Sequence, residues 1–149
     1  MNDIKDPQHA ITNERGQSLA EMALMMSFLL ILLVGVVDLG RGFFVYLALR
    51  DAAQEGALFG STDPTNNADI EARVRNSSSL LENLSADLNA NTNVVISIDG
   101  SACTGGGITV RVSYDNFPIT MPFLGSLIGR QTVPISTSIT DTILNPACP

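Results

Sequence analysis

The side chains that usually carry catalysis or bind metal ions are scarce in this sequence. A single histidine, His9, lies in the polar N-terminal segment, and the two cysteines, Cys103 and Cys148, stand far apart. This set excludes the commonest zinc ligand sets and the catalytic triads that need a well-placed imidazole. The part after Gly60 contains Ser, Asp and Glu but neither His nor Lys, so a nucleophile would have no base beside it. We therefore expect no enzyme, no catalytic residues, no metal site and no cofactor.

Charge and length narrow the class of protein further. The 149 residues suit one globular domain plus an appendage. Eight Lys and Arg against fifteen Asp and Glu give a net charge of -7, so a basic face that could follow a phosphate backbone is missing. The Gly105–Gly107 run lacks the helix and lysine that follow a phosphate loop, which favours a hairpin turn. We expect neither a nucleic acid nor a small-molecule substrate as partner.

The apolar residues are concentrated in a charge-free run, Met22–Val37. As a helix it would span roughly 24 Å, and the flanking turns extend it to the roughly 30 Å of a hydrocarbon core. The alternative is a buried helix of a soluble core, but the rest of the chain offers too little surface to bury it. We predict one transmembrane segment at about residues 18–40, with Glu21 and Asp38 at its two interfaces. Asp38 and Arg41 share one face, so we expect an interfacial ion pair worth under about 1 kcal/mol.

The helix should continue beyond the membrane, because no proline interrupts the chain between Arg41 and Gly60 and helix-forming residues dominate there. We expect one helix from about Ser18 to Gly60. Small residues recur at every fourth position along one of its faces: Ala48, Ala52, Gly56 and Gly60. Such a stripe lets another element, from the same chain or a second copy, approach the backbone closely. The alternative is that the glycines simply fray the helix end.

The pattern changes after residue 60. Residues 61–67 form a turn-rich linker, and apolar residues on helical spacing predict a weaker helix at about Asn67–Leu88 with an interruption near Asn76–Ser79. Alternation with a period of two then predicts three strands, at residues 94–98, 108–114 and 132–143. The second strand turns Ile108, Val110, Val112 and Tyr114 to one face, as in a sheet covered on one side. The expected fold is α+β: a long transmembrane helix continuing into a small domain with a second helix and a three-stranded antiparallel sheet.

The N-terminal segment carries the most specific signal. Its polar residues end in Arg15-Gly16, and Gln17-Ser18-Leu19-Ala20-Glu21 leads into the apolar run. A secretory signal peptide has its cleavage site after the apolar stretch, whereas this glycine precedes it. A glycine followed at the fifth position by glutamate resembles the cleavage site of type IV pilin-like precursors, which a prepilin peptidase cuts on the cytoplasmic side. The resemblance implies cleavage between Gly16 and Gln17, with the membrane helix retained.

Further motifs extend the resemblance along the helix: Arg15-Gly16-Gln17-Ser18-x-x-Glu21-x-Ala23-Leu24, then Asp38-x-Gly40-Arg41, then Ala52-Ala53-x-Glu55-Gly56-Ala57. Together they resemble the TadE-like family of tight-adherence pilus biogenesis. This implies a pseudopilin, a minor pilin-like subunit without catalytic activity, working with a prepilin peptidase, other pilin-like subunits and a pilus assembly platform. It also implies a leader at residues 1–16, a long helix at 17–60 and an exported domain at 61–149. Ser27 stands where many relatives carry proline, which implies a straighter helix.

The implied location is the bacterial cytoplasmic membrane, with the leader cytoplasmic and the domain outside, or the pilus itself. Cleavage would create an ammonium group at Gln17, and in pilin-like assemblies the glutamate equivalent to Glu21 is thought to compensate that charge on a neighbouring subunit. A carboxylate inside an apolar segment costs a few kcal/mol without a partner. The alternative is that Glu21 simply lies at the headgroup boundary. A competing function is a membrane-tethered extracellular binding module, which would keep residues 1–16.

The implied topology also bears on the cysteines. Everything after about Asp38 would lie outside the cytoplasmic membrane, where disulfides persist. Cys103 lies near the tip of the first hairpin, and an antiparallel third strand would bring Cys148 to the same edge of the sheet. We expect a bridge between them, worth roughly 4 kcal/mol in the chain-entropy account. The alternative is two unrelated thiols.

Overall fold

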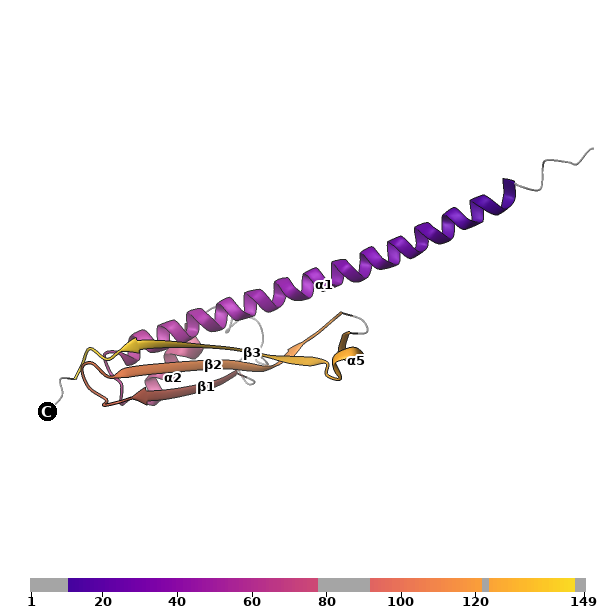
Figure 1. The fold of residues 1–149 in the computed structure, drawn as a ribbon. Coiled ribbons are helices and arrows are strands. Elements are labelled where there is room, and N and C mark those ends of the chain that lie inside the picture. The colour runs from indigo at the N-terminus through magenta and orange to yellow at the C-terminus, as the bar shows by residue number, and fades with distance from the viewer. Residues whose placement is uncertain (1–10, 78–91, 122–123, 147–149) are drawn as a thin grey trace, which may run out of the picture.

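The structure, a computed structural model, describes residues 11–77, 92–121 and 124–146, and shows a long helix lying across one face of a three-stranded sheet (Figure 1). The elements in chain order are α1 (Ile11–Gly60), α2 (Asn67–Asn76), β1 (Thr92–Asp99), β2 (Gly107–Pro118), α5 (Leu124–Ile128) and β3 (Thr132–Thr142). The predicted α+β fold, with its long N-terminal helix, second helix and antiparallel sheet, is confirmed. The long helix begins at Ile11, earlier than the expected start at Ser18.

The helix α1 runs without a break for 50 residues. Figure 1 shows it gently curved and free of a sharp kink. The Ser27 hydroxyl donates a hydrogen bond to the Ala23 carbonyl at 2.9 Å, so this polar side chain is satisfied within the helix. At the other end the Ser61 amide donates to the Ala57 carbonyl at 2.9 Å, and the Ser61 hydroxyl donates to the Leu58 carbonyl at 2.7 Å. These bonds occupy carbonyls that the end of the helix would otherwise leave unpaired.

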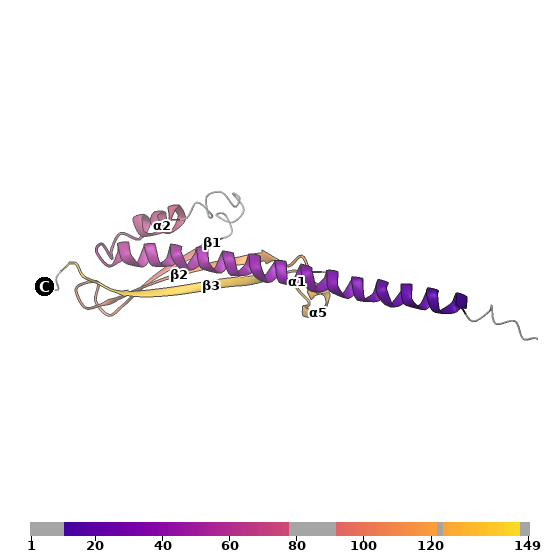
Figure 2. The ribbon, with the colours of Figure 1, turned by 90° about the horizontal axis from the view of Figure 1, so that it is seen from above.

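The two halves of α1 have different surroundings. The N-terminal half projects beyond the sheet, whereas the C-terminal half lies along it (Figures 1 and 2). One face of the C-terminal half is buried in the core: Val45, Leu49, Ala52, Ala53 and Ala57. The domain is therefore built on the continuation of the apolar helix rather than connected to it by a linker.

The sheet has the order β1-β2-β3 with both pairs antiparallel, as predicted for β2 and β3. Val110 of β2 lies between Ile96 of β1 and Ile139 of β3. The apolar face of β2 is turned into the core, and its members are all nearly inaccessible to water: Ile108, Val110, Val112 and Tyr114. On the opposite face the hydroxyls of Thr109 and Thr140 form a hydrogen bond at 2.8 Å. One face is therefore covered by helix and the other faces solvent.

The second helix, α2, covers part of the same core. The Asn66 side chain caps it by accepting a hydrogen bond from the Asp69 amide at 3.3 Å. Ile70 and Val74 are completely buried against α1 and the sheet. The structure ends α2 at Asn76, where the sequence predicted an interruption. The apolar positions expected to continue it lie outside the described residues: Leu81, Leu84 and Leu88.

Candidate functional site

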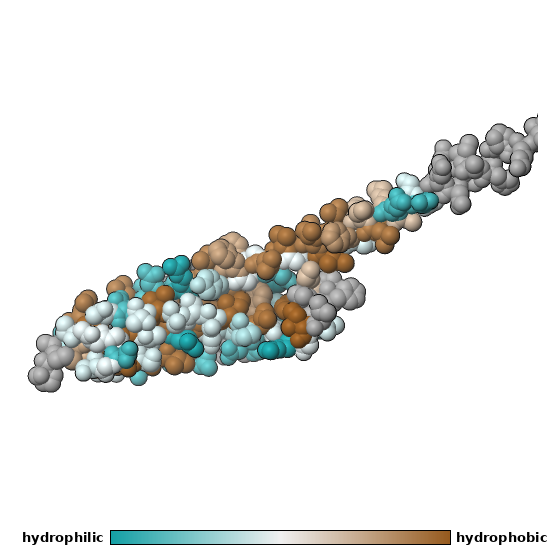
Figure 3. Space-filling model, viewed as in Figure 1, coloured by the Kyte–Doolittle hydropathy of each residue, from teal (hydrophilic) through white to brown (hydrophobic). Residues whose placement is uncertain are grey.

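The N-terminal half of α1 presents apolar side chains on every side. All residues from 16 to 33 are exposed; Leu24 is 73 % and Leu30 is 59 % accessible. Figure 3 shows most of this stretch as a hydrophobic surface outside the domain, with a hydrophilic patch at its N-terminal end. Soluble monomers rarely expose so large an apolar surface. Among the described residues, α1 is the one helix long and apolar enough to cross a membrane, and none of its most apolar window is buried. The chain thus carries an N-terminal membrane helix, and burial in a soluble core is contradicted.

The residues of the expected cleavage site and Glu21 lie at the start of this half. Gly16 has open space around it, because a Cβ atom added there would meet nothing within 4 Å. The Gln17 side-chain amide donates to a Glu21 carboxylate oxygen at 3.3 Å, one helical turn away. Both side chains are exposed. Packing within the chain therefore gives no reason for a glycine at position 16.

Asp38 makes contacts that helical spacing did not reveal. Its side chain is only about 10 % exposed, and its carboxylate accepts hydrogen bonds from the backbone amides of Thr120 at 2.8 Å and Met121 at 2.7 Å. The Thr120 hydroxyl donates a third bond to the same carboxylate. Arg41 Nη1 lies 3.7 Å from Asp38 Oδ1 and donates to the Thr120 hydroxyl oxygen at 3.2 Å. We name Asp38, Arg41, Thr120 and Met121 the Asp38 clamp, because they fasten the end of β2 to α1.

Contacts before and after Asp38 on the same face of α1 support the Asp38 clamp. The Arg41 guanidinium lies over the Phe117 ring, 5.6 Å from its centroid. The same ring lies 3.7 Å from where a Cβ of Gly42 would be, and the Met121 methyl group lies 3.1 Å from where a Cβ of Gly35 would be. The connection after β2 therefore meets the helix at the end of the apolar run. The sequence signal was weak: one threonine within an apolar stretch.

The stripe of small residues faces the domain of the same chain. Ala52 is fully buried and Ala48 is 7 % exposed. A Cβ at Gly56 would lie 2.4 Å from Val74 Cγ2, and one at Gly60 would lie 2.5 Å from Ile108 Cδ1. Both glycines belong to α1 and touch neighbouring elements, which differs from a frayed end. Of the two occupants left open by the sequence, the chain's own α2 and β2 fill this face.

The loop that carries Cys103 meets the segment that follows β3. Cys103 is 7 % exposed, and the amide of the next residue, Thr104, donates to the Pro146 carbonyl at 2.8 Å. The Ile143 amide donates to the Gly106 carbonyl at 2.8 Å. Cys148 lies outside the described residues, so the predicted bridge stays a prediction.

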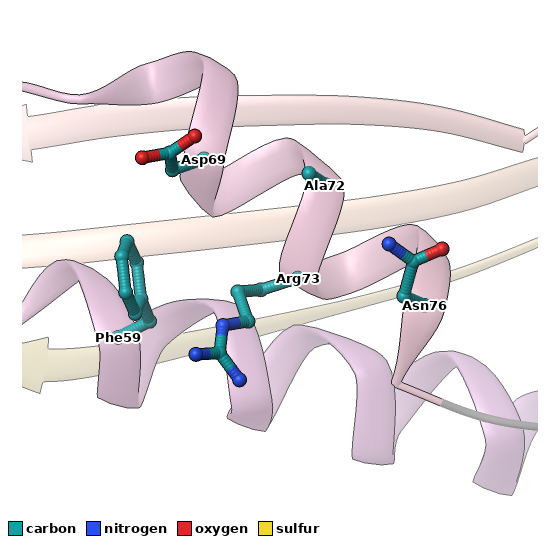
Figure 4. A pocket seen from close by; sticks show the side chains of 5 residues that line it. All are labelled: Phe59, Asp69, Ala72, Arg73 and Asn76. Carbon is teal, nitrogen blue, oxygen red and sulfur yellow. The ribbon is translucent and has the colours of Figure 1, made fainter.

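A shallow depression lies between the end of α1 and α2, lined by Phe59, Asp69, Ala72, Arg73 and Asn76 (Figure 4). The Arg73 guanidinium lies over the Phe59 ring, 5.2 Å from its centroid, and its Nη1 atom lies 3.8 Å from a Glu55 carboxylate oxygen. The arginine is thus engaged with the neighbouring helix. Within residues 11–77, 92–121 and 124–146, no three His, Cys, Asp or Glu side chains converge as metal ligands would.

These features define a membrane-anchored protein whose small α+β domain is built on the continuation of its membrane helix. Residues 16–58 match the family model described as TadE-like protein, which confirms the resemblance seen in the sequence. The TadE-like family is a structural family associated with the Tad pilus, and the matched residues 16–58, less than half of this chain, are similar to it. The match covers the apolar run, the α1 half of the Asp38 clamp and most of the stripe. No curated protein and no solved structure matches the chain.

Proposed function

We propose that this chain is a minor pilin-like subunit, a pseudopilin, in biogenesis of a tight-adherence (Flp-type) pilus, and that it assembles through α1 after removal of residues 1–16. The observation that carries the proposal is the fully exposed apolar half of α1, which begins directly at Gly16 and lies within the TadE-like match. Its partners are the membrane, a prepilin peptidase, other pilin-like subunits and the assembly platform.

The open space around Gly16 supports the peptidase step. A glycine inside a helix costs roughly 1 kcal/mol relative to alanine, so it needs a reason. Gly56 and Gly60 have such a reason in close packing, whereas a Cβ added at Gly16, like one added at Gly40, would meet nothing within 4 Å. A peptidase that requires a glycine before the scissile bond supplies one for Gly16.

The occupied stripe determines which surface remains for a second subunit. Because α2 and β2 of the same chain fill the face of Gly56 and Gly60, a neighbouring helix cannot use it without displacing the domain. The exposed residues 16–33 are free to meet lipid or other helices. Assembly then proceeds through the N-terminal half of α1, where Glu21 is the exposed acid nearest the new ammonium group at Gln17.

A bridge between Cys103 and Cys148 completes the proposal for the exported domain. The hydrogen bond from Thr104 to Pro146 supports it, because it holds the Cys103 loop two residues from Cys148 along the chain. The expected location outside the cytoplasmic membrane favours the oxidised form.

Cleavage tests the proposal against the alternative of an unprocessed binding module. Intact-mass measurement of the chain coexpressed with a prepilin peptidase should show loss of residues 1–16, and Gly16→Val should prevent it. Gly40→Val is a matched control, because a Cβ added at Gly40 would also meet nothing within 4 Å and this glycine lies far from the scissile bond. A mature protein that still begins at Met1 in its native host would contradict the pseudopilin and favour the binding module.

A further inference from the structure

The end of the sheet beside the projecting half of α1 carries the connection from β2 to β3. The Ile119 amide donates to the Gln131 carbonyl at 3.0 Å, which closes the base of this connection. The Met121 amide is bound to Asp38, and the Met121 side chain lies against Gly35. Figures 1 and 2 show α5 at this end of the sheet, level with the middle of α1 along the helix and set apart from it in Figure 1. Met121 is therefore fixed at the height of Gly35 and Asp38.

The rise per residue of an α-helix gives the depth of Gly35 and Asp38 in a bilayer. A hydrocarbon core of about 30 Å takes about twenty helical residues at 1.5 Å each. If Glu21 lies at the inner boundary, the outer boundary falls near Arg41. Asp38 and Gly35 then lie roughly 5 and 9 Å on the membrane side of that boundary. Met121, which contacts both residues, cannot stand clear of the lipid surface.

The exposed side chains of the connection are of types that favour a membrane surface. Ile128 of α5 is 50 % exposed although it is apolar, and Arg130 follows it on the surface. Arg41 of the Asp38 clamp is 48 % exposed at the same end of the domain. Apolar side chains flanked by arginines favour the layer in which acyl chains meet lipid phosphates.

We propose that this end of the domain, which we call the foot and define by Met121, Ile128 and Arg130, lies in the outer headgroup layer of a phospholipid membrane and reaches the edge of its hydrocarbon core at Met121. The proposal rests on the membrane anchoring by α1 and goes beyond it, because a helix alone would let the domain stand off from the bilayer. The sheet then stands upright along α1 with its β1–β2 turn pointing away from the lipid. A subunit leaving the membrane must release the foot as well as the helix.

Single-tryptophan quenching tests the position of the foot, because the chain contains no tryptophan. The full chain is reconstituted in phosphatidylcholine vesicles containing lipids brominated near the headgroup or deep in the acyl chain. Ile128→Trp and Arg130→Trp probe the foot, and Leu144→Trp probes the opposite end of the sheet, where Leu144 is 65 % exposed. Leu30→Trp and Leu39→Trp mark the middle and the outer end of the apolar helix. Far-ultraviolet circular dichroism checks that each variant keeps the fold.

We expect Ile128→Trp to be quenched by the shallow bromines about as strongly as Leu39→Trp, with emission shifted to the blue, while Leu144→Trp is unaffected. If Leu30→Trp is quenched by the deep bromines but both foot probes behave like Leu144→Trp, the proposal that the foot contacts lipid is wrong, and the membrane anchoring by α1 is still supported. If Leu30→Trp is not quenched either, the anchoring itself fails, and the foot with it. If Ile128→Trp changes the circular dichroism spectrum, the quenching of Arg130→Trp is used in its place to test the foot.

Discussion

The close approach of α1 and α2 at Gly56 leads to a quantitative prediction. A methyl group added at Gly56 would lie 2.4 Å from Val74 Cγ2 and 3.3 Å from Val110 Cγ1. Both neighbours are β-branched and fully buried, so neither can turn aside easily. Gly60 is a less severe case, since its nearest neighbour is the flexible end of Ile108.

Two opposing terms set the size of the effect of Gly56→Ala. Alanine favours a helix interior over glycine by roughly 1 kcal/mol. Overpacking a core by one carbon costs roughly 1–3 kcal/mol. Gly40→Ala is the matched control. It gains the same free energy from the higher helix propensity of alanine, but a Cβ at Gly40 meets nothing within 4 Å. We expect Gly40→Ala to stabilise the protein, and Gly56→Ala to be about 1–3 kcal/mol less stable than Gly40→Ala.

Thermal unfolding of the full chain in detergent micelles, followed by near-ultraviolet circular dichroism of the domain, measures this difference. For a domain of this size about 1 kcal/mol shifts Tm by roughly 4–8 °C, so the two variants should separate clearly. Equal Tm values for Gly56→Ala and Gly40→Ala would refute the close packing of α1 on α2. Gly56→Leu should then also be tolerated, whereas the structure predicts that it unfolds the domain.

Three further outcomes are expected. Asp38→Ala should destabilise the domain by about 2–4 kcal/mol, because it leaves two part-buried amides without their charged acceptor. Those amides should lose protection in hydrogen exchange; unchanged protection would contradict the Asp38 clamp. The Glu21→Ala protein should be cleaved and inserted normally but should reduce piliation. The control Asp51→Ala, at another exposed acid, should leave piliation unchanged. Wild-type piliation in the Glu21 variant would count against the pairing of Glu21 with the ammonium group at Gln17 of a neighbouring subunit. Non-reducing peptide mapping should join Cys103 to Cys148, and free thiols after rapid alkylation would disprove the bridge.

The sheet could be predicted because its signal is local. In β2, Ile108, Val110 and Val112 alternate with Thr109 and Arg111, and this alternation alone indicates which face is buried. The same logic identified the long helix from its apolar run and its lack of proline. The start of α1 was predicted at Ser18 and lies at Ile11, because no residue between the two positions stops a helix.

The Asp38 clamp could not be predicted because its partners are distant in the chain. Helical spacing places Arg41 beside Asp38, and the two side chains do meet. The stronger contacts come from Thr120 and Met121, more than 80 residues away. No periodic pattern links an aspartate in a helix to two amides beyond a strand. The stripe shows the same limit, since spacing identified the small residues but left open whether a second copy or the chain's own domain covers them.

The division of α1 into two halves bears on what drives assembly. A helix that passes from lipid into a bundle of other helices gains little hydrophobic free energy, because acyl chains are as apolar as leucine. The exposed residues 16–33 therefore bind membrane strongly but select a partner weakly. Selection must come from a group that lipid satisfies poorly, and Glu21 is the acid in this stretch. This is why its replacement by alanine should leave insertion intact while assembly is reduced.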